Sequence, residues 1–227
     1  MFKPFRELLT MNSLLIATNN KGKVEELHDL LQGMDLELVT PSQIGLDLDV
    51  TEDGHTYAEN ASKKAVAFAK ASGLISLADD SGLEVDALGG APGLYSARYG
   101  SINGEKLSDA ERRKYLLSQL QDKPRPWLAR FKATLAIAIP EALWIQAARR
   151  LNVQQQSAGL QIFDGICPGE IIPEERGTGG FGYDPIFLLP ELGKTMAELG
   201  MDEKNRLSHR ARAVMNAKWI LEKIFAQ

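Results

Sequence analysis

The chain has 227 residues, of which 44% are hydrophobic and 25% are charged, and its formal net charge at pH 7 is -4. Such a mildly acidic chain shows no sign of a nucleic-acid polymer as its partner. Its single cysteine, Cys167, excludes an intramolecular disulfide and any metal cluster built from several cysteines. These properties predict a globular protein from a reducing compartment, and we expect that compartment to be the cytoplasm.

The beginning of the chain, residues 1–12, is expected to be an extension before a single domain that covers residues 13–227. Residues 1–10 lack the apolar core of a secretory signal. The apolar run 133–139 ends at Pro140, well short of the ~18 residues that a membrane span requires. We therefore expect no contact with a membrane.

A strand, a loop and a helix are predicted in succession at the start of the domain. Residues 13–18 are apolar and partly β-branched, and a helical apolar pattern follows the loop 19–23. A loop before a helix directs backbone N–H groups and the positive end of the helix dipole to one place, beside Lys21 and Lys23. The loop can bind a phosphate, although the spacing of a Walker loop is absent and a turn with surface lysines needs no ligand.

The next segment is acidic and lies between two predicted elements. A strand is expected at 36–39 and a helix at 56–72, where Thr56 and Glu59 have the spacing of a capping box. The acidic loop 47–54 connects them. A solvated surface is the simpler interpretation of this loop, and the alternative is that one of its carboxylates reaches a metal.

The stretch 77–93 is the predicted centre of the chemistry. The apolar run 74–78 predicts a buried strand, and Asp79-Asp80-Ser81-Gly82 predicts a turn at its end. Because side chains alternate along an extended chain, Asp79 and Asp80 are expected to point in different directions and to have separate roles. Carboxylates beside a buried strand need a cation or hydrogen-bond donors, so a metal or a catalytic proton is one interpretation and a simple turn is the other.

The second half of the chain continues the alternation of strands and helices. A helix is predicted over 108–121, where Ser108 and Glu111 again have the spacing of a capping box. Apolar patterns predict strands at 130–139, 143–145, 160–162 and 186–189. The polar segment 149–159 is expected to be a hairpin loop or an insertion.

A glycine-rich segment precedes the last predicted strand. Residues 177–185 contain four glycines together with Phe181 and Tyr183. Glycines let backbone approach a ligand closely, and flexibility alone does not require aromatic side chains. We expect this segment to contact a ligand.

The chain ends in a predicted helix that begins after Ser208. Its expected apolar face consists of Val214, Ala217, Leu221 and Ile224. The first turn carries His209, Arg210 and Arg212, whose charges oppose the helix dipole unless an anionic or polar ligand offsets them.

Together, these elements predict an α/β fold with loops gathered at one edge of a central sheet. The loops supply lysines for phosphates, carboxylates for Mg²⁺ and aromatic rings for a base. We expect a site for a metal-bound nucleoside polyphosphate, although an ATPase would need similar parts.

Five segments resemble the inosine/xanthosine triphosphate pyrophosphatase family in their order and spacing. They are Thr18-Asn19-Asn20-Lys21-Gly22-Lys23, Ala78-Asp79-Asp80-Ser81-Gly82-Leu83, residues 89–99, residues 177–187, and Lys204 with Ser208-His209-Arg210. The resemblance implies an α/β fold with a long curved mixed sheet flanked by helices, bilobed with a central cleft. It also implies a Mg²⁺-dependent homodimer. Its substrates would be ITP, dITP and XTP, cleaved to the monophosphate and pyrophosphate to clear deaminated purines from the nucleotide pool.

The same resemblance implies roles for individual residues. Asp80 would be the catalytic proton acceptor and a metal ligand, and Glu52 would be the second metal ligand. The nucleotide would contact Thr18, Asn19, Asn20, Lys21, Gly22, Lys23, Ser81, Phe181, Gly182, Tyr183, Asp184, Lys204, His209 and Arg210.

Two alternatives stay open at this point. A related nucleotide pyrophosphatase acting on pyrimidine or modified nucleoside triphosphates would share the fold and the metal chemistry. A nucleotide-sensing module would bind the same ligand without hydrolysis. Donors from His209 or Arg210 would favour a 6-keto purine over adenine, so selectivity is expected at the base edge.

Overall fold

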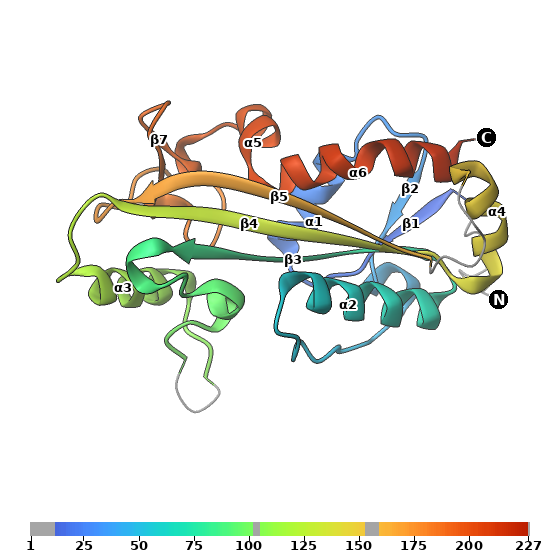
Figure 1. Ribbon diagram of the computed structural model, residues 1–227, viewed down its shortest axis with the longest axis horizontal. Coiled ribbons are helices and arrows are strands. Elements are labelled where there is room, and N and C mark those ends of the chain that lie inside the picture. Colours follow the sequence, from blue (N-terminus) through green and yellow to red (C-terminus); the bar gives the residue numbers. More distant parts are fainter. Residues whose placement is uncertain (1–11, 102–104, 153–158, 227) are drawn as a thin grey trace. The chain divides into compact units, whose positions relative to one another are not determined.

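The computed structural model describes residues 12–101, 105–152 and 159–226. Within them, seven strands form one sheet in the order β2-β1-β3-β4-β5-β6-β7 (Figure 1). The strands are β1 (Ser13–Ile16), β2 (Glu37–Val39), β3 (Ile75–Val85), β4 (Trp127–Ala138), β5 (Leu160–Ile171), β6 (Phe187–Leu189) and β7 (Lys194–Thr195). β1 pairs in parallel with β2 and β3, whereas β6 pairs antiparallel with β5 and β7. The sheet is therefore mixed, and the predicted α/β class is confirmed.

Helices flank this sheet. They are α1 (Lys21–Leu30), α2 (Tyr57–Ser72), α3 (Asp109–Leu120), α4 (Glu141–Leu151), α5 (Met201–Leu207) and α6 (His209–Phe225). The sequence patterns did not predict α5 or the two-residue strand β7. In the described ranges, no helix combines the length and the apolar character needed to cross a membrane.

The chain divides into two compact units. Unit 1 comprises the described parts of Met1–Asp80, Thr134–Asp164 and Ala213–Gln227, and unit 2 comprises those of Ser81–Ala133 and Gly165–Arg212. The division passes through β3, β4 and β5, so each of these strands contributes residues to both units. One domain over residues 13–227 stays a prediction. Residues 1–11, nearly all of the predicted extension, lie outside the described residues.

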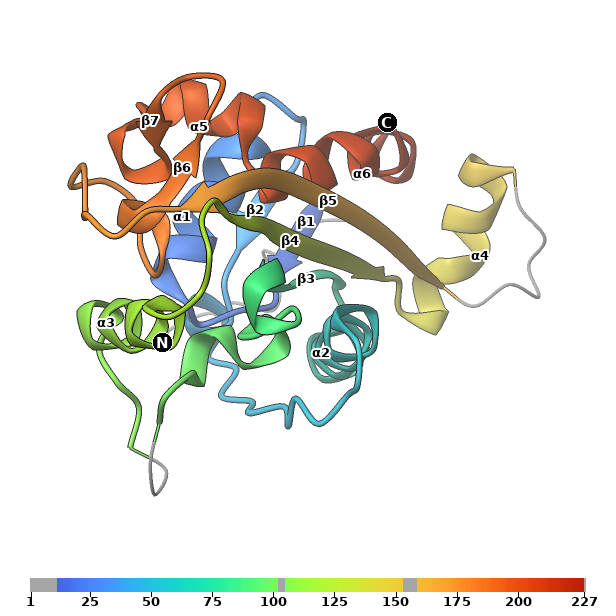
Figure 2. The same ribbon diagram turned by 60° about the vertical axis from the view of Figure 1, so that its left-hand side comes forward.

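In unit 1, α2 and α6 cover opposite faces of the sheet (Figures 1 and 2). Thr56 caps α2 as predicted, because its Oγ1 accepts the N–H of Glu59 at 3.1 Å. The Glu59 carboxylate accepts from the N–H of His55 instead of Thr56, so the predicted capping box is only half formed. The predicted apolar face of α6 is confirmed, since its members are at most 4% exposed: Val214, Ala217, Leu221 and Ile224.

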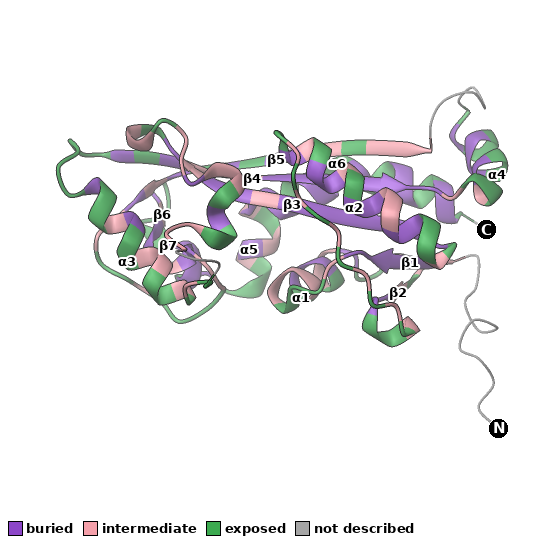
Figure 3. Ribbon diagram, turned by 90° about the horizontal axis from the view of Figure 1, so that it is seen from below, coloured by how far each residue is buried: buried purple, intermediate pink, exposed green. Residues whose placement is uncertain are grey.

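In unit 2, α3 packs on a core supplied by β3, β4 and β5. Ser108 and Glu111 form the predicted capping box at its start. The core contains Leu83, Val85, Leu116, Leu120, Trp127, Ala129, Phe131, Cys167, Ile171, Tyr183, Ile186, Phe187, Leu189, Met196 and Leu199. β3 and β4 are buried along most of their length (Figure 3).

The turn predicted at Asp79-Asp80-Ser81-Gly82 is wrong. These residues continue β3, which runs for 11 residues. Asp79 is 0% exposed and Asp80 is 8% exposed, so neither carboxylate leaves the interior. Local preference for a turn is overridden because lysines from two helices neutralise these carboxylates inside the fold.

The strand predicted at 143–145 is also wrong, because these residues lie in α4. Trp144, Ala147, Ala148 and Leu151 are buried at helical spacing. A short apolar run fits a strand or a helix, and only its continuation decides between them. The segment 149–159, predicted to be a hairpin loop or an insertion, begins with the last residues of α4, and its residues 153–158 lie outside the described residues.

The buried cysteine supports a first prediction. Cys167 is 1% exposed, and burial raises the pKa of its thiol to about 11. We expect no reaction with a disulfide reagent at pH 8 in the native protein and one equivalent after unfolding in guanidinium, because the thiolate is the reactive form. A spectrophotometric thiol assay measures both, and rapid native labelling would contradict the buried environment.

Candidate functional site

Consecutive carboxylates of β3 bind to different helices. The Oδ2 of Asp79 lies 3.0 Å from Nζ of Lys23, in the first turn of α1. The Oδ2 of Asp80 accepts from Nδ2 of Asn60 at 3.1 Å, and its Oδ1 lies 3.7 Å from Nζ of Lys64, both on α2. The alternation expected for an extended chain therefore gives the two residues separate partners.

Lys64 joins the carboxylates of this cluster. Its Nζ donates to Oε1 of Glu52 at 2.6 Å and to the carbonyl oxygen of Asp79 at 2.8 Å. The side chain is only 11% exposed, so its charge acts in a poorly hydrated environment. One ammonium thus stands beside both predicted metal ligands, Glu52 and Asp80.

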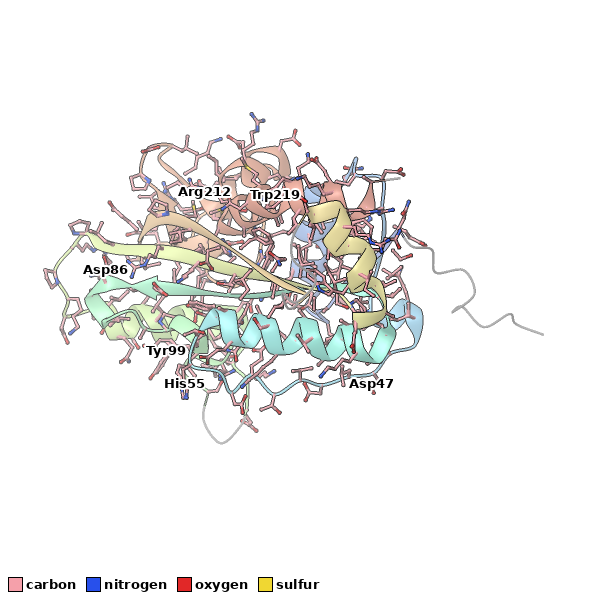
Figure 4. The ribbon with its side chains drawn as sticks, turned by 45° about the vertical axis from the view of Figure 1, so that its right-hand side comes forward. Asp47, His55, Asp86, Tyr99, Arg212 and Trp219 are labelled. Carbon is pink, nitrogen blue, oxygen red and sulfur yellow. The ribbon has the colours of Figure 1, made fainter. Side chains whose placement is uncertain are left out.

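The alternation of the acidic segment explains why Glu52 faces inward. The segment from Asp47 to His55 runs along α2 (Figure 4). Its even-numbered residues 48–54 are half-buried, while its odd-numbered residues 47–55 are exposed. Glu52 thereby pairs with the buried Lys64 of α2, whereas Asp53 pairs with Lys63 at the exposed surface of the same helix.

Asn60 connects the acidic segment to the catalytic candidate. Its Oδ1 accepts the N–H of Gly54 at 2.8 Å, while its Nδ2 donates to Asp80. A Cβ at Gly54 would lie 2.6 Å from that Oδ1, so only glycine permits this approach. The amide is 2% exposed and holds the orientation of the Asp80 carboxylate.

Opposing effects act on the pKa of Asp80, and the net shift is upward. Burial raises the pKa of this carboxyl above its ordinary value, and the negative charge of Glu52 acts in the same direction. The ammonium groups of Lys64 and Lys23 and the hydrogen bond from Asn60 lower the pKa and oppose this effect. Such a carboxylate is a stronger base than an exposed aspartate.

The predicted phosphate loop is shorter than expected, because α1 already begins at Lys21. Asn20 caps this helix, and its Oδ1 accepts the N–H of Lys23 at 3.1 Å. Thr18 Oγ1 accepts the N–H of Asn20 at 3.2 Å. Lys21 is exposed, as is Asn19, whereas Lys23 and Gly22 are half-buried. This arrangement leaves a helix N-terminus with Lys23 directed toward Asp79.

A second cluster lies in unit 2 around Asp184. This carboxylate is 5% exposed. It accepts hydrogen bonds from Nζ of Lys204 at 2.7 Å and from the backbone N–H of Phe181 at 3.0 Å. A Cβ at Gly180 would lie 2.0 Å from Asp184 Oδ2. One of the four glycines is thus explained by packing against the protein's own carboxylate.

The ring of Phe181 faces two cations. Lys204 Nζ lies 5.4 Å and Arg210 Cζ lies 5.9 Å from its centroid. Arg210 is 1% exposed and donates to Oγ of Ser81 at 3.1 Å. His209 stacks on Phe131 with a centroid distance of 4.8 Å. The structure thus brings the five predicted residues Ser81, Phe181, Lys204, His209 and Arg210 into unit 2.

Tyr183 differs from its neighbours in the same segment. It is 4% exposed within the unit 2 core, and its hydroxyl donates to the carbonyl oxygen of Ser96 at 3.0 Å. Burial raises the pKa of this hydroxyl above its ordinary value. Its side chain therefore anchors the segment instead of offering a ring for stacking.

Asn60 and Lys64 are the functional candidates that sequence reasoning missed. Both are buried on α2, in line with Ala61, Ala65 and Phe68. A polar residue inside a predicted apolar stripe is a signal for a buried polar partner, and this signal was present in the sequence.

The fold and these clusters define a class, an α/β protein equipped to bind an anionic ligand beside a buried carboxylate. The model of the Ham1 family matches residues 14–219. The chain belongs to the Ham1 family.

Similar proteins from other organisms are named dITP/XTP pyrophosphatase. A dITP/XTP pyrophosphatase of Desulforamulus reducens is 44% identical over 213 residues, which cover 93% of this chain and 96% of the relative. One of Bacillus subtilis is 40% identical, with 95% of this chain and 100% of the relative covered. The solved Staphylococcus aureus Ham1 protein is 37% identical, with a TM-score of 0.74 and coverage of 92% of this chain and 98% of that one.

Proposed function

We propose that this chain hydrolyses the deaminated purine nucleotides dITP, ITP and XTP to the nucleoside monophosphate and pyrophosphate. The names of the relatives support this reaction and this substrate class. The observation that carries the proposal is the buried Asp80 carboxylate, held by Asn60 and Lys64 next to the Lys23–Asp79 pair. We propose that this base and the two ammonium groups beside it act on the polyphosphate.

In the proposed reaction, Asp80 accepts a proton from the water that attacks the α phosphorus. The bond between the α phosphorus and the bridging oxygen breaks, and pyrophosphate leaves. Lys23 and Lys64 stabilise the negative charge of the phosphate chain. The helix N-terminus at Asn20 supplies backbone N–H groups to the same anion.

We propose Mg²⁺ as the cofactor. Among the described residues, no group of three or more His, Cys, Asp and Glu side chains is arranged for a metal. Mg²⁺ does not require one, because one or two carboxylates with substrate phosphates and waters commonly hold it. Glu52 and Asp80 fit this pattern. Their carboxylates both lie beside the ammonium group of Lys64, at 2.6 Å and 3.7 Å, and so face the same cationic position. Bound Mg²⁺ would supply Lewis-acid stabilisation of phosphate charge.

We assign recognition of the base to the cluster of unit 2. Phe181 provides a half-buried ring, and stacking of a base on such a ring contributes about 1–3 kcal/mol for any base. Selectivity must therefore come from hydrogen bonds. Donors from Arg210 and His209 would favour the 6-keto group of hypoxanthine and xanthine and would meet a donor in adenine.

The test is identification of the first products by phosphorus NMR, with ITP, XTP, dUTP, dTTP and ATP as substrates and Mg²⁺ present. The expected result is pyrophosphate as the first product and a preference for ITP and XTP. Orthophosphate as the first product would contradict the proposal. A preference for a pyrimidine would favour the alternative pyrophosphatase, and binding of ITP without turnover would favour a sensing module.

A substitution pair tests the role of Glu52 with the metal. Glu52→Gln is expected to raise the Mg²⁺ concentration for half-maximal activity roughly tenfold, because a carboxylate ligand is lost. Asp53→Asn is the matched control and is expected to stay within about twofold, since Asp53 points to solvent. Mg²⁺ titration of initial rates measures both, and equal responses would contradict the assignment.

We also propose a homodimer in the cytoplasm. Met215 and Trp219 lie one turn apart on α6 and are 65% and 52% exposed, and two apolar side chains at this spacing support a contact with a second copy. Figure 4 shows Trp219. The nucleotide substrates in the relatives' names support the compartment. Sedimentation over a range of concentrations tests the assembly, and a monomer throughout would contradict it.

A further inference from the structure

Helix α3 holds the segment that carries Phe181 through the peptide groups of Gly182. The N–H of Gly182 donates to Oδ2 of Asp109 at 2.6 Å, and its carbonyl oxygen accepts from Nη1 of Arg113 at 2.9 Å. Asp109 and Arg113 are four residues apart and so lie on one face of the helix. Both bonds to Gly182 are charge-assisted and come from one rigid element.

Arg113 also holds the beginning of the same segment. Its Nε and Nη2 donate to the two carboxylate oxygens of Glu175 at 2.9 Å and 2.8 Å. This pair lowers the pKa of Glu175 below its ordinary value. The side chain of Arg113 is 12% exposed. One arginine therefore connects α3 to two points that are seven residues apart in the chain.

The segment needs such fixation because its backbone is unusually free. Gly177, Gly180 and Gly182 have φ values of 81°, 71° and 61°, and glycines lose the most conformational entropy on ordering. Beyond Gly182, Tyr183 is fixed in the core through Ser96. Phe181 immediately precedes the peptide held by α3.

We infer that Asp109 and Arg113 are positioning residues that set the ring of Phe181 for stacking on the purine. The inference rests on the proposed function, in which Phe181 contacts the base. Neither residue has to touch the nucleotide. The pair acts on the nucleoside part of the substrate and leaves binding of the phosphate chain unchanged.

Steady-state kinetics of Arg113→Met provide the test. We expect the KM for ITP to rise roughly tenfold with kcat within about threefold, because binding of the base is lost more than stabilisation of the transition state. The inhibition constant of inorganic tripolyphosphate, which has no base, should stay within about twofold. Lys114→Met removes the same charge from the next position of α3, which is exposed, and should leave both constants unchanged.

Two milder variants guard against a folding defect. Glu175→Gln keeps the bonds to Gly182 and is expected to give a smaller rise in KM. Arg113→Lys keeps the positive charge but lacks the planar, two-pronged guanidinium. Its KM for ITP should therefore stay as high as that of Arg113→Met. In ligand-free protein, hydrogen exchange of the peptide 177–183 should become faster in Asp109→Asn and Arg113→Met and not in Lys114→Met.

The outcomes separate this inference from the proposed function. An equal weakening of tripolyphosphate, or an unchanged KM with faster exchange, would overturn the positioning role. Unchanged exchange in the variants would overturn the fixation itself. A wild-type protein that releases no pyrophosphate from ITP would overturn the proposed function. The hydrogen-exchange measurement would still show whether α3 fixes the segment 177–183.

Discussion

Asp80→Asn is expected to lower kcat for ITP by at least about 10³-fold, because it removes the general base and one charge from the metal site. Asparagine has the shape of aspartate, and its Oδ1 can still accept from Asn60. The measurement is the initial rate of pyrophosphate release at saturating Mg²⁺. Activity near that of the wild type would exclude Asp80 as the base.

The same variant has an expected effect on stability. Burial raises the pKa of Asp80 in the folded protein, so ionising this carboxyl costs more free energy in the folded state than in the unfolded state, and its charge at neutral pH lowers stability. A neutral asparagine should leave the urea midpoint unchanged or raise it. A lower midpoint would mean that the charge of Asp80 stabilises the fold. Asp53→Asn, at an exposed position, should retain both activity and midpoint.

Asp184→Asn is expected to lower the free energy of unfolding by about 3 kcal/mol, as is typical when one partner of a buried ion pair is removed. The side chains of Asp184 and Lys204 are 7% and 8% exposed, so water cannot replace the lost charge well. The same carboxylate accepts the N–H of Phe181, and we expect the KM for ITP to rise as well. Urea unfolding followed by circular dichroism measures the stability change.

An exposed ion pair between α5, the helix of Lys204, and β7 provides the control. Glu203 pairs with Lys194, and the two side chains are 41% and 47% exposed. Glu203→Gln should change the free energy of unfolding by no more than about 0.5 kcal/mol, because surface pairs contribute little. If Asp184→Asn were equally mild, Asp184 would serve the substrate alone and not the fold.

Local signals predicted several elements well. Thr56, Ser108 and Ser208 all accept a backbone N–H in the first turn of their helices. Such caps involve residues within three positions of one another, so a short stretch of sequence contains the whole interaction. The apolar face of α6 was predicted for the same reason, because helical spacing alone defines it.

Other features could be identified only from the tertiary structure. Local preference predicted a turn at Asp79-Asp80-Ser81-Gly82, whereas partners from α1 and α2 make it a buried strand. Tyr183 was predicted to contact substrate, and its side chain lies in the core because it packs against residues distant in the sequence. Glu52 is an intermediate case, since the alternation of residues 46–54 in the sequence already favours an inward side chain.

By itself, the sequence determined the α/β class, the helix caps and the resemblance to a nucleotide pyrophosphatase family, because periodicity, capping and motif spacing are properties of the chain order. Only the tertiary structure decided that Asp79 binds Lys23, that Asp80 is held by Asn60 and Lys64, and that α3 fixes Gly182. These contacts join residues between 16 and 73 positions apart. The charges and pKa values of a site depend on such neighbours, and no local pattern specifies them.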